Sequence, residues 1–272
     1  MKMPMISKIS VQKNNPRRYN VFLDTGNGEE YAFSVDQDVL VKFRLRKGME
    51  LDDLLLEEIT HYDEVSRAHQ MAVRFLAVRK RTEAEVRNHL LKKNVPEFAI
   101  EEAIHKLYEY NYLDDEDYAR SYVRTQMNTA GKGPELIRRE LEQRGVKAPL
   151  IDMALEEYPE EKQFEKAMEL CEKMAAKNRR DSKQVMKQKM EQLLLRKGFS
   201  YDMISSVTEK VCANMAGEDQ ELEALRYQAE KAHRKYAGLE PFRYRQKMKE
   251  TLYRKGFSLD LIERYLAERE EE

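Results

Sequence analysis

Apolar residues recur with the same spacing at four places along the chain. In each copy a Leu is followed after three residues by Gly or Asn, then at once by Val or Phe, and after four more residues by Ile. After three more residues, the next position is Ile or Leu in three copies and Thr in the other. The copies are Leu90/Asn94/Val95/Ile100/Ile104, Leu141/Gly145/Val146/Ile151/Leu155, Leu194/Gly198/Phe199/Ile204/Thr208 and Leu252/Gly256/Phe257/Ile262/Leu266. The Gly or Asn positions lie 51, 53 and 58 residues apart, which predicts a tandem array of helical modules.

Each copy of this signature predicts a helix end, a tight turn and a new helix. Gly, and less often Asn, adopts the left-handed conformation that ends a helix, and the next apolar residue commonly packs back onto the last turn. The following Ile would then contact the Leu that precedes the Gly. A unit of this size buries too little apolar surface to be very stable alone, so neighbouring modules are expected to stack.

Residues 5–35 follow a different pattern, with three short runs of residues that favour strands. The runs contain Ile6/Ile9/Val11, Tyr19/Val21/Leu23 and Tyr31/Phe33/Val35, and in the second and third runs the apolar residues occupy every second position. Asn14-Asn15-Pro16 and Gly26-Asn27-Gly28 separate them, and the second is a strong hairpin signal. We predict a small antiparallel sheet, then a short helix from Asp36 to Phe43 and a turn that ends at Gly48. Because so small a sheet is marginal alone, it should pack on the first module.

The predicted fold class is therefore mainly α: tandem three-helix repeats in an elongated curved array, preceded by a small antiparallel β-hairpin or sheet domain. The alternative is that the four modules fold into one globular bundle. The expected domains are a β-rich domain with a short helix and four three-helix modules: 1–62, 63–113, 114–158, 159–216 and 217–272.

Local signals indicate where helices begin in these modules. The first helix of module 1 is expected from about Glu64, and Thr82 with Glu85 forms a capping box at its second helix. Asp114 is the expected N-cap at the start of module 2, followed by acidic residues that suit the positive end of a helix dipole. Gly133-Pro134 starts the second helix of that module, and modules 3 and 4 begin near Pro159 and Glu218.

Charge changes sign from module to module. The whole chain has 49 Lys and Arg against 50 Asp and Glu. Residues 65–113 carry nine basic and six acidic side chains, residues 114–158 carry seven and ten, and residues 159–214 carry twelve and nine. A dedicated DNA clamp would be more uniformly positive. The alternation favours a protein partner with a mixed-charge surface.

The sequence offers little for catalysis. The five His residues show no HxxxH or HExxH spacing, and the Cys pair, Cys171 and Cys212, has no CxxC motif. Residues 130–134 (AGKGP) lack the spacing of a phosphate-binding loop. We expect no enzymatic activity, no metal and no cofactor. The first ten residues have no secretion-signal character and no apolar run is long enough for a spanning helix, so a cytoplasmic location without a membrane span is expected.

Module 2 resembles a known family. The resemblance rests on Tyr112-Leu113-Asp114-Asp115, Tyr118-Ala119, Gly133-Pro134, Ile137, Glu140-Leu141 and Gly145-Val146. These residues are similar to the signature of RecX, a family of bacterial regulators of the RecA recombinase. The stretch from Arg81 to Leu90 is similar to the start of that family's first repeat, and the chain as a whole resembles the longer Gram-positive form. Asn111 and Asn94 stand where the family usually has Gly, and both are residues that tolerate positive φ.

The resemblance implies a partner and a mode of action. RecX proteins bind the RecA–DNA filament in its helical groove, contact several protomers and lower ATP hydrolysis, strand exchange and coprotease activity. They thereby act in homologous recombination, DNA repair and the SOS response. We expect this chain to act as a monomer on the RecA filament.

Basic residues recur at two equivalent places in the modules and are the candidate partner-binding residues. The turn row follows the first helix of a module, and the end row closes its second helix. The candidates of the turn row are Arg79, Lys80, Arg81, Lys132, Arg179 and Arg180, and those of the end row are Lys92, Lys93, Arg144, Arg196, Lys197, Arg254 and Lys255. Lys177, Arg234 and Lys235 also lie in the turn row. Cations near helix C-termini also stabilise the helix dipole by ~0.3–1 kcal/mol each. Our sharper hypothesis is that one row touches acidic protomer surfaces or DNA phosphates.

Two other functions compete with this interpretation. The first is a DNA-binding protein built from helix-turn-helix-like modules, in which direct contact with DNA would show steep salt dependence. The second is a helical scaffold for some other protein. Five tyrosines between Tyr108 and Tyr122 could stack on bases, but their spacing is more typical of half-buried helix–helix packing.

Overall fold

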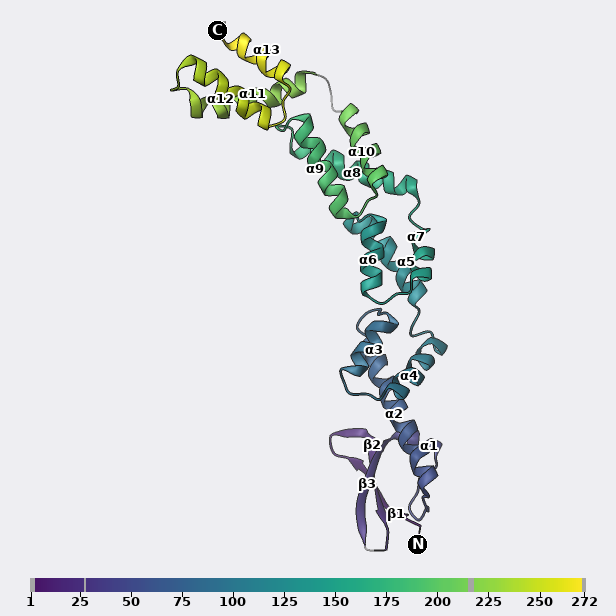
Figure 1. Cartoon of the computed structure of the whole chain (residues 1–272). Helices are drawn as coiled ribbons and strands as arrows, with labels where there is room; N and C mark the ends of the chain where they lie inside the picture. The colour runs from purple at the N-terminus through teal and green to yellow at the C-terminus, as the bar shows by residue number, and fades with distance from the viewer. Residues whose placement is uncertain (1–2, 27, 215–217, 271–272) are drawn as a thin grey trace. The chain divides into compact units, whose positions relative to one another are not determined.

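A computed structural model describes residues 3–26, 28–214 and 218–270 (Figure 1). These residues form a three-stranded sheet, thirteen α-helices and one π-helical segment. The chain divides into two compact units. One comprises Met1–Ala119 with Glu142–Leu150, and the other Arg120–Leu141 with Ile151–Glu272. Asn27 of the expected hairpin and the expected boundary at 216–217 lie outside the described residues.

The predicted antiparallel sheet is confirmed. Strands β1 (Met5–Gln12), β2 (Asn15–Asp24) and β3 (Glu29–Asp36) are hydrogen-bonded in that order. Val21 at the centre of β2 is fully buried. The turn between β1 and β2 is tighter than expected, because Asn15 and Pro16 already belong to β2.

A short and a long helix follow the sheet. Helix α1 (Gln37–Lys42) begins as expected, since the Asp36 side chain accepts a hydrogen bond from the Asp38 N–H. Helix α2 (Asp53–Leu76) begins well before the expected start near Glu64. The missed signal is the Asp52 carboxylate, which accepts a hydrogen bond of 2.7 Å from the Leu55 N–H. The first helix of module 1 therefore also covers the sheet.

A buried ion pair and an apolar cluster attach the sheet to α2. Ile59 and Tyr62 of α2 pack in the same cluster as the buried face of the sheet. Beside them, Asp63 accepts hydrogen bonds from Arg18 at 2.9 Å and from the Asp36 N–H at 2.8 Å. The expected packing of the sheet on the first module is thus confirmed.

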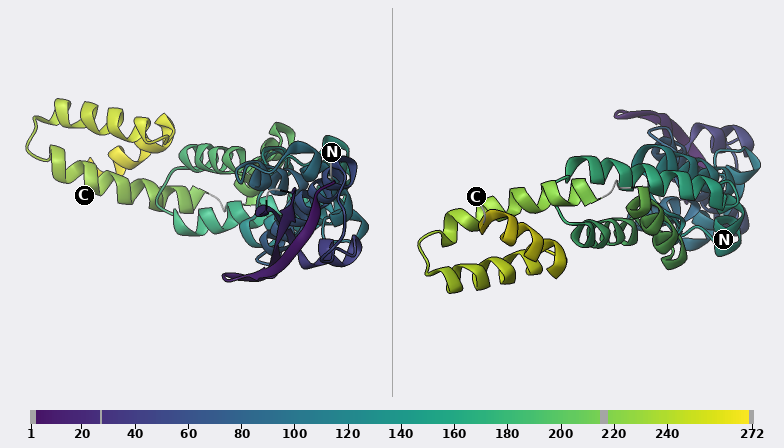
Figure 2. Two further views of the ribbon diagram at one scale, coloured as in Figure 1. Left: turned by 90° about the horizontal axis from the view of Figure 1, so that it is seen from below. Right: turned by 90° about the horizontal axis from the view of Figure 1, so that it is seen from above.

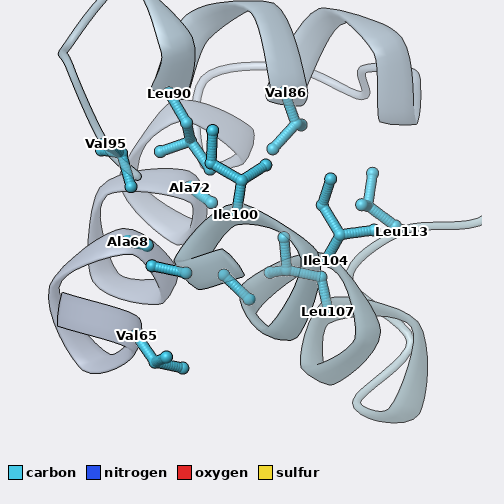
Figure 3. Close-up of a cluster of buried hydrophobic side chains, with 12 residues drawn as sticks. Val65, Ala68, Ala72, Val86, Leu90, Val95, Ile100, Ile104, Leu107 and Leu113 are labelled. Carbon is cyan, nitrogen blue, oxygen red and sulfur yellow. The ribbon is translucent and has the colours of Figure 1, made fainter. Parts of the chain in front are cut away.

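Module 1 has a hydrophobic core built from three helices (Figure 3). Helix α2 supplies small residues such as Ala68 and Ala72, which allow α4 (Glu97–Glu109) to approach closely. Helix α3 (Glu83–Leu91) supplies Val86 and Leu90, and begins with the predicted capping box.

The repeated signature folds as predicted. The Val or Phe that follows the Gly or Asn donates its backbone N–H to the carbonyl of the signature Leu. The bonds are Val95→Leu90, Phe199→Leu194 and Phe257→Leu252, at 3.2, 3.1 and 3.3 Å. This bond spans a residue with positive φ, as in a Schellman turn. The positive-φ residues are Asn94, Gly145, Gly198 and Gly256, and Asn111 also has φ 56°.

Module 2 consists of α5 (Asp115–Thr125), a π-helical segment (Gln126–Ala130), α6 (Pro134–Gln143) and α7 (Ala148–Leu155). The expected N-cap is confirmed, because the Asp117 N–H donates to Asp114 Oδ1 at 2.8 Å. The π-helical segment was not predicted. It ends at Gly131, which has φ 56°.

Modules 3 and 4 repeat the arrangement. Module 3 has α8 (Glu160–Lys177), α9 (Lys183–Lys197) and α10 (Tyr201–Asn214), and module 4 has α11 (Glu218–Tyr236), α12 (Pro241–Arg254) and α13 (Leu259–Glu270). Helices α11 and α12 lie side by side, joined by a short turn (Figure 2). In the described residues the cores of modules 1, 3 and 4 share no residue, which argues against one merged bundle core.

Candidate functional site

The end of the second helix in one module contacts the start of the second helix in the preceding module. At junction 1, Thr82 Oγ1 donates to the Arg144 carbonyl at 2.7 Å. At junction 2, the Gly133 N–H donates to the Lys197 carbonyl at 2.8 Å. At junction 3, Ser182 Oγ donates to the Lys255 carbonyl at 2.6 Å. In each case the accepting carbonyl belongs to the residue directly before the capping glycine. The bond thus gives a partner to one of the carbonyls that a helix end leaves without a hydrogen bond inside the helix.

The capping glycines are required by close approach as well as by conformation. A Cβ on Gly145 would lie 2.3 Å from Ala84 Cβ, and a Cβ on Gly198 would lie 2.4 Å from the Leu136 nitrogen. A Cβ on Gly256 would lie 2.6 Å from Ser182 Oγ. Asn94 closes the second helix of module 1, which has no module before it. Asn94 is therefore the signature position at which no preceding module lies close enough to exclude a Cβ.

These junctions bring the two rows of candidate cations together. The turn row of one module and the end row of the next flank the same contact. Junction 1 has Arg79, Lys80, Arg81 and Arg144, junction 2 has Lys132, Arg196 and Lys197, and junction 3 has Arg179, Arg180, Arg254 and Lys255. Lys92 and Lys93 lie at the end of α3, outside these junctions. The structure thus groups the two rows into three junction clusters, and contact of either row with a partner stays a prediction.

At junction 1 the three turn-row cations are engaged within the chain. Arg79 donates to Glu85 at 2.8 Å, Lys80 pairs with Asp117, and the Arg81 guanidinium lies 4.0 Å from the centre of the Phe75 ring. Burial alone would raise the pKa of Glu85, but its hydrogen bonds from Arg79 and the Thr82 N–H, with the nearby Arg144 charge, hold that pKa below its usual value. All three cations are therefore occupied within the chain, and the contact of Lys80 joins module 1 to module 2.

Several cations at the other junctions are also engaged. Lys132 pairs with Glu140 at 2.6 Å, and Lys197 donates to the Ala130 carbonyl at 2.7 Å. Arg180 donates to the Tyr227 hydroxyl at 2.9 Å. The Arg254 Nε donates to the Glu250 carbonyl at 3.3 Å within the same helix.

Five candidate cations remain open to a partner. They are exposed, and within residues 3–26, 28–214 and 218–270 they form no ion pair, side-chain hydrogen bond or ring contact: Lys92, Lys93, Arg179, Arg196 and Lys255. Sequence position alone could not separate these five from the engaged cations, because the separation depends on which carboxylates, carbonyls, hydroxyls and rings the fold brings near.

A buried carboxylate completes junction 1. Asp115 is almost fully buried and accepts a hydrogen bond of 2.9 Å from the Glu83 N–H. Burial raises its pKa, and the charges of Glu83 and Asp114 act in the same direction, while the Glu83 N–H and Lys147 oppose them. The ionised form is therefore disfavoured in the folded chain.

Asp115→Asn should consequently increase stability near pH 7, by less than about 1 kcal/mol because the dipole of α5 favours a negative charge there. The folded pKa lies above the unfolded one, so ionised Asp115 costs stability at neutral pH and this cost disappears as the pH falls through the folded pKa. Melting followed by circular dichroism at pH 7 and at about pH 4 checks this, since the difference between variant and wild type should shrink at the lower pH. A variant that is less stable at pH 7 would contradict it.

The tyrosines mostly serve packing and hydrogen bonding. Tyr118 is buried, Tyr108 donates to Glu83 at 3.0 Å, and Tyr122 donates to Glu140 at 2.7 Å. Tyr110 and Tyr112 are exposed and meet the His69 ring edge-on. The expectation of half-buried packing holds for the first three and not for the last two.

The described residues offer little reactive chemistry. Among them, no group of three or more His, Cys, Asp or Glu side chains is placed to hold a metal ion. Burial raises the pKa of the Cys171 thiol to about 12, which keeps it protonated. In the part of the chain that the structure describes, no helix is both long and apolar enough to cross a membrane.

Comparison with known proteins identifies the family. Domain models match in sequence: Regulatory protein RecX N-terminal domain at residues 4–52, and the first, second and third three-helix domains of RecX at 68–107, 114–155 and, twice, at 160–208 and 218–266. Regulatory protein RecX of Bacillus subtilis (strain 168) is 46% identical over 268 residues, 98% of this chain and 100% of that protein.

Solved structures agree. A crystal structure of regulatory protein RecX has a TM-score of 0.63 and 37% identity, covering 76% of this chain and 100% of that one. The crystal structure of RecX from Lactobacillus salivarius has a TM-score of 0.53 and 37% identity, covering 55% and 97%. The chain therefore belongs to the RecX family of regulatory proteins.

Proposed function

We propose that this chain is a non-enzymatic regulator that binds the RecA–DNA filament, bridges neighbouring protomers in the filament groove, and inhibits ATP hydrolysis, strand exchange and coprotease activity. The observation that carries the proposal is its membership, over nearly its full length, in a family of regulatory proteins named RecX. We propose further that it acts as a monomer in the cytoplasm and needs no cofactor.

The repeated junctions support a partner that is itself repetitive. Each junction has basic side chains from two modules around the same helix–helix contact. When several weak contacts are linked in one chain, the second and later contacts form at a high effective concentration. Occupancy of several protomers would then exclude a second DNA strand or a substrate repressor without any reaction at the interface.

The charge distribution favours a protein surface over bare DNA. Module 2 is net negative between two net positive segments, and several junction cations already pair with carboxylates of this chain. Only part of the positive charge is therefore available for phosphates. A direct DNA-binding role would instead require strong binding to bare DNA that weakens steeply with salt.

The test is the DNA-dependent ATP hydrolysis of RecA with and without the full chain. Addition of the chain at a stoichiometric amount should lower the steady-state rate, because the filament is occupied or capped. The same titration on bare single-stranded DNA, followed by fluorescence anisotropy, separates the two partners. An unchanged hydrolysis rate at stoichiometric amounts, with strong binding to bare DNA, would reject the proposal in favour of the DNA-binding role.

A further inference from the structure

An exposed apolar side chain recurs at one position of the repeat. It is the residue directly after the buried Leu of the signature, near the end of the second helix. In modules 1, 3 and 4 this residue is Leu91, Leu195 or Tyr253, and these side chains are 43, 50 and 60% exposed. In module 2 the equivalent residue is Glu142, which is also exposed.

Basic residues follow each of these apolar residues. We call the three sets the end patches: Leu91/Lys92/Lys93, Leu195/Arg196/Lys197 and Tyr253/Arg254/Lys255. Within the described parts of the chain, Lys92, Lys93, Arg196 and Lys255 form no ion pair with a carboxylate. In modules 3 and 4, the start of the third helix adds another exposed apolar side chain, Tyr201 or Leu259.

The recurrence distinguishes the end patches from ordinary surface. A single exposed apolar residue is normal on a soluble protein and has no functional meaning. Here the same position is apolar in three of four modules, and each time open cations adjoin it. Whatever covers these positions must combine apolar contact with negative charge.

This combination favours a protein partner over a nucleic acid. Phosphates would use the cations but gain nothing from Leu91 or Leu195, and bases stack on aromatic rings rather than on leucine. Protein interfaces, in contrast, typically bury an apolar anchor within a polar rim. A socket of apolar residues rimmed by carboxylates would match each end patch.

We propose that the end patches of modules 1, 3 and 4 dock onto a repeated protein surface. Each of several RecA protomers would offer one apolar socket rimmed by carboxylates, and module 2 would make no such contact. This inference rests on the proposed function. It assigns the contact with RecA to the ends of α3, α9 and α12 and gives α6 no apolar anchor.

The test compares two full-length variants on filaments assembled from RecA and single-stranded DNA with a non-hydrolysable ATP analogue. Leu195→Asp/Tyr253→Asp removes two anchors without touching a cation. Leu54→Asp/Phe242→Asp is the matched control, since these residues are 74 and 80% exposed and lie outside the end patches. All four sites are on the surface, and circular dichroism verifies the helix content of both variants.

The end-patch variant should bind the filament at least about tenfold more weakly than wild type, whereas the control should stay within about twofold. Bare-DNA binding should be the same for all three proteins. Equal weakening of the control, unchanged filament binding by the end-patch variant, or a loss of bare-DNA binding would each overturn the inference while wild type still binds the filament. Failure of wild type to bind the filament would overturn the proposed function as well.

Discussion

Replacing Gly198 with alanine is expected to lower the free energy of unfolding of the modules it joins by about 3 kcal/mol. Two costs combine. The residue has φ +81°, where an L side chain costs about 1–2 kcal/mol. The added Cβ would also lie 2.4 Å from the Leu136 nitrogen, and overpacking against backbone typically costs about 1–3 kcal/mol. Urea unfolding followed by circular dichroism measures the loss.

Gly48→Ala provides the matched control. Gly48 has φ +85°, but no atom lies within 4 Å of the position that its Cβ would occupy. Its replacement should therefore cost only the conformational part, about 1–2 kcal/mol. If both substitutions cost the same, close packing at junction 2 would play no part, and the glycine would serve only to end the helix.

Reversing the charge of the five open cations should weaken inhibition of RecA ATP hydrolysis by about tenfold or more. The variant is Lys92→Glu/Lys93→Glu/Arg179→Glu/Arg196→Glu/Lys255→Glu. Exposed ion pairs contribute roughly 0.2–1 kcal/mol each, so the loss of five amounts to about 1–5 kcal/mol, against the ~1.4 kcal/mol that corresponds to tenfold. The concentration that halves the hydrolysis rate is the measurement, and the effect should shrink as salt is raised.

The control for this variant carries the same change of net charge. Five other exposed cations, Lys13, Arg46, Lys47, Arg139 and Lys162, are reversed instead. If both variants lose inhibition equally, net charge rather than the open cations would be responsible. Reversal of Arg79, Lys80 and Arg81 would be less informative. These side chains contact Glu85, Asp117 and Phe75 within the chain, so their reversal would disturb junction 1 itself.

The local parts of the fold were predictable because their causes are local. The capping box at Thr82 and the helix end at Asn94 depend on a few adjacent residues, and both are confirmed. The early start of α2 was missed because Asp52 lies outside the repeated signature from which the modules were recognised. Its role as an N-cap is nevertheless an ordinary one.

The contacts between modules could not be derived from the pattern. Thr82 and Ser182 are recognisable as N-caps, but the same hydroxyls also donate to carbonyls 62 and 73 residues away. The close approach of a neighbouring module, which requires glycine at the helix ends in addition to the positive φ, is also a contact between modules and could not be derived from the pattern. For the site, the sequence located the basic residues, whereas only the fold shows which of them already have partners.

Modules 1 and 4 each have one helix end that differs from the helix ends at the three junctions. At one end, Asn94 carries a Cβ at the position where the inner junctions leave no room for one. At the other end, Glu240 offers a carboxylate where Thr82 and Ser182 offer donating hydroxyls, and the bulky Phe242 follows it. Asn94 and Glu240 therefore lack, respectively, the bare backbone and the hydroxyl donor that the contacts at junctions 1 and 3 use.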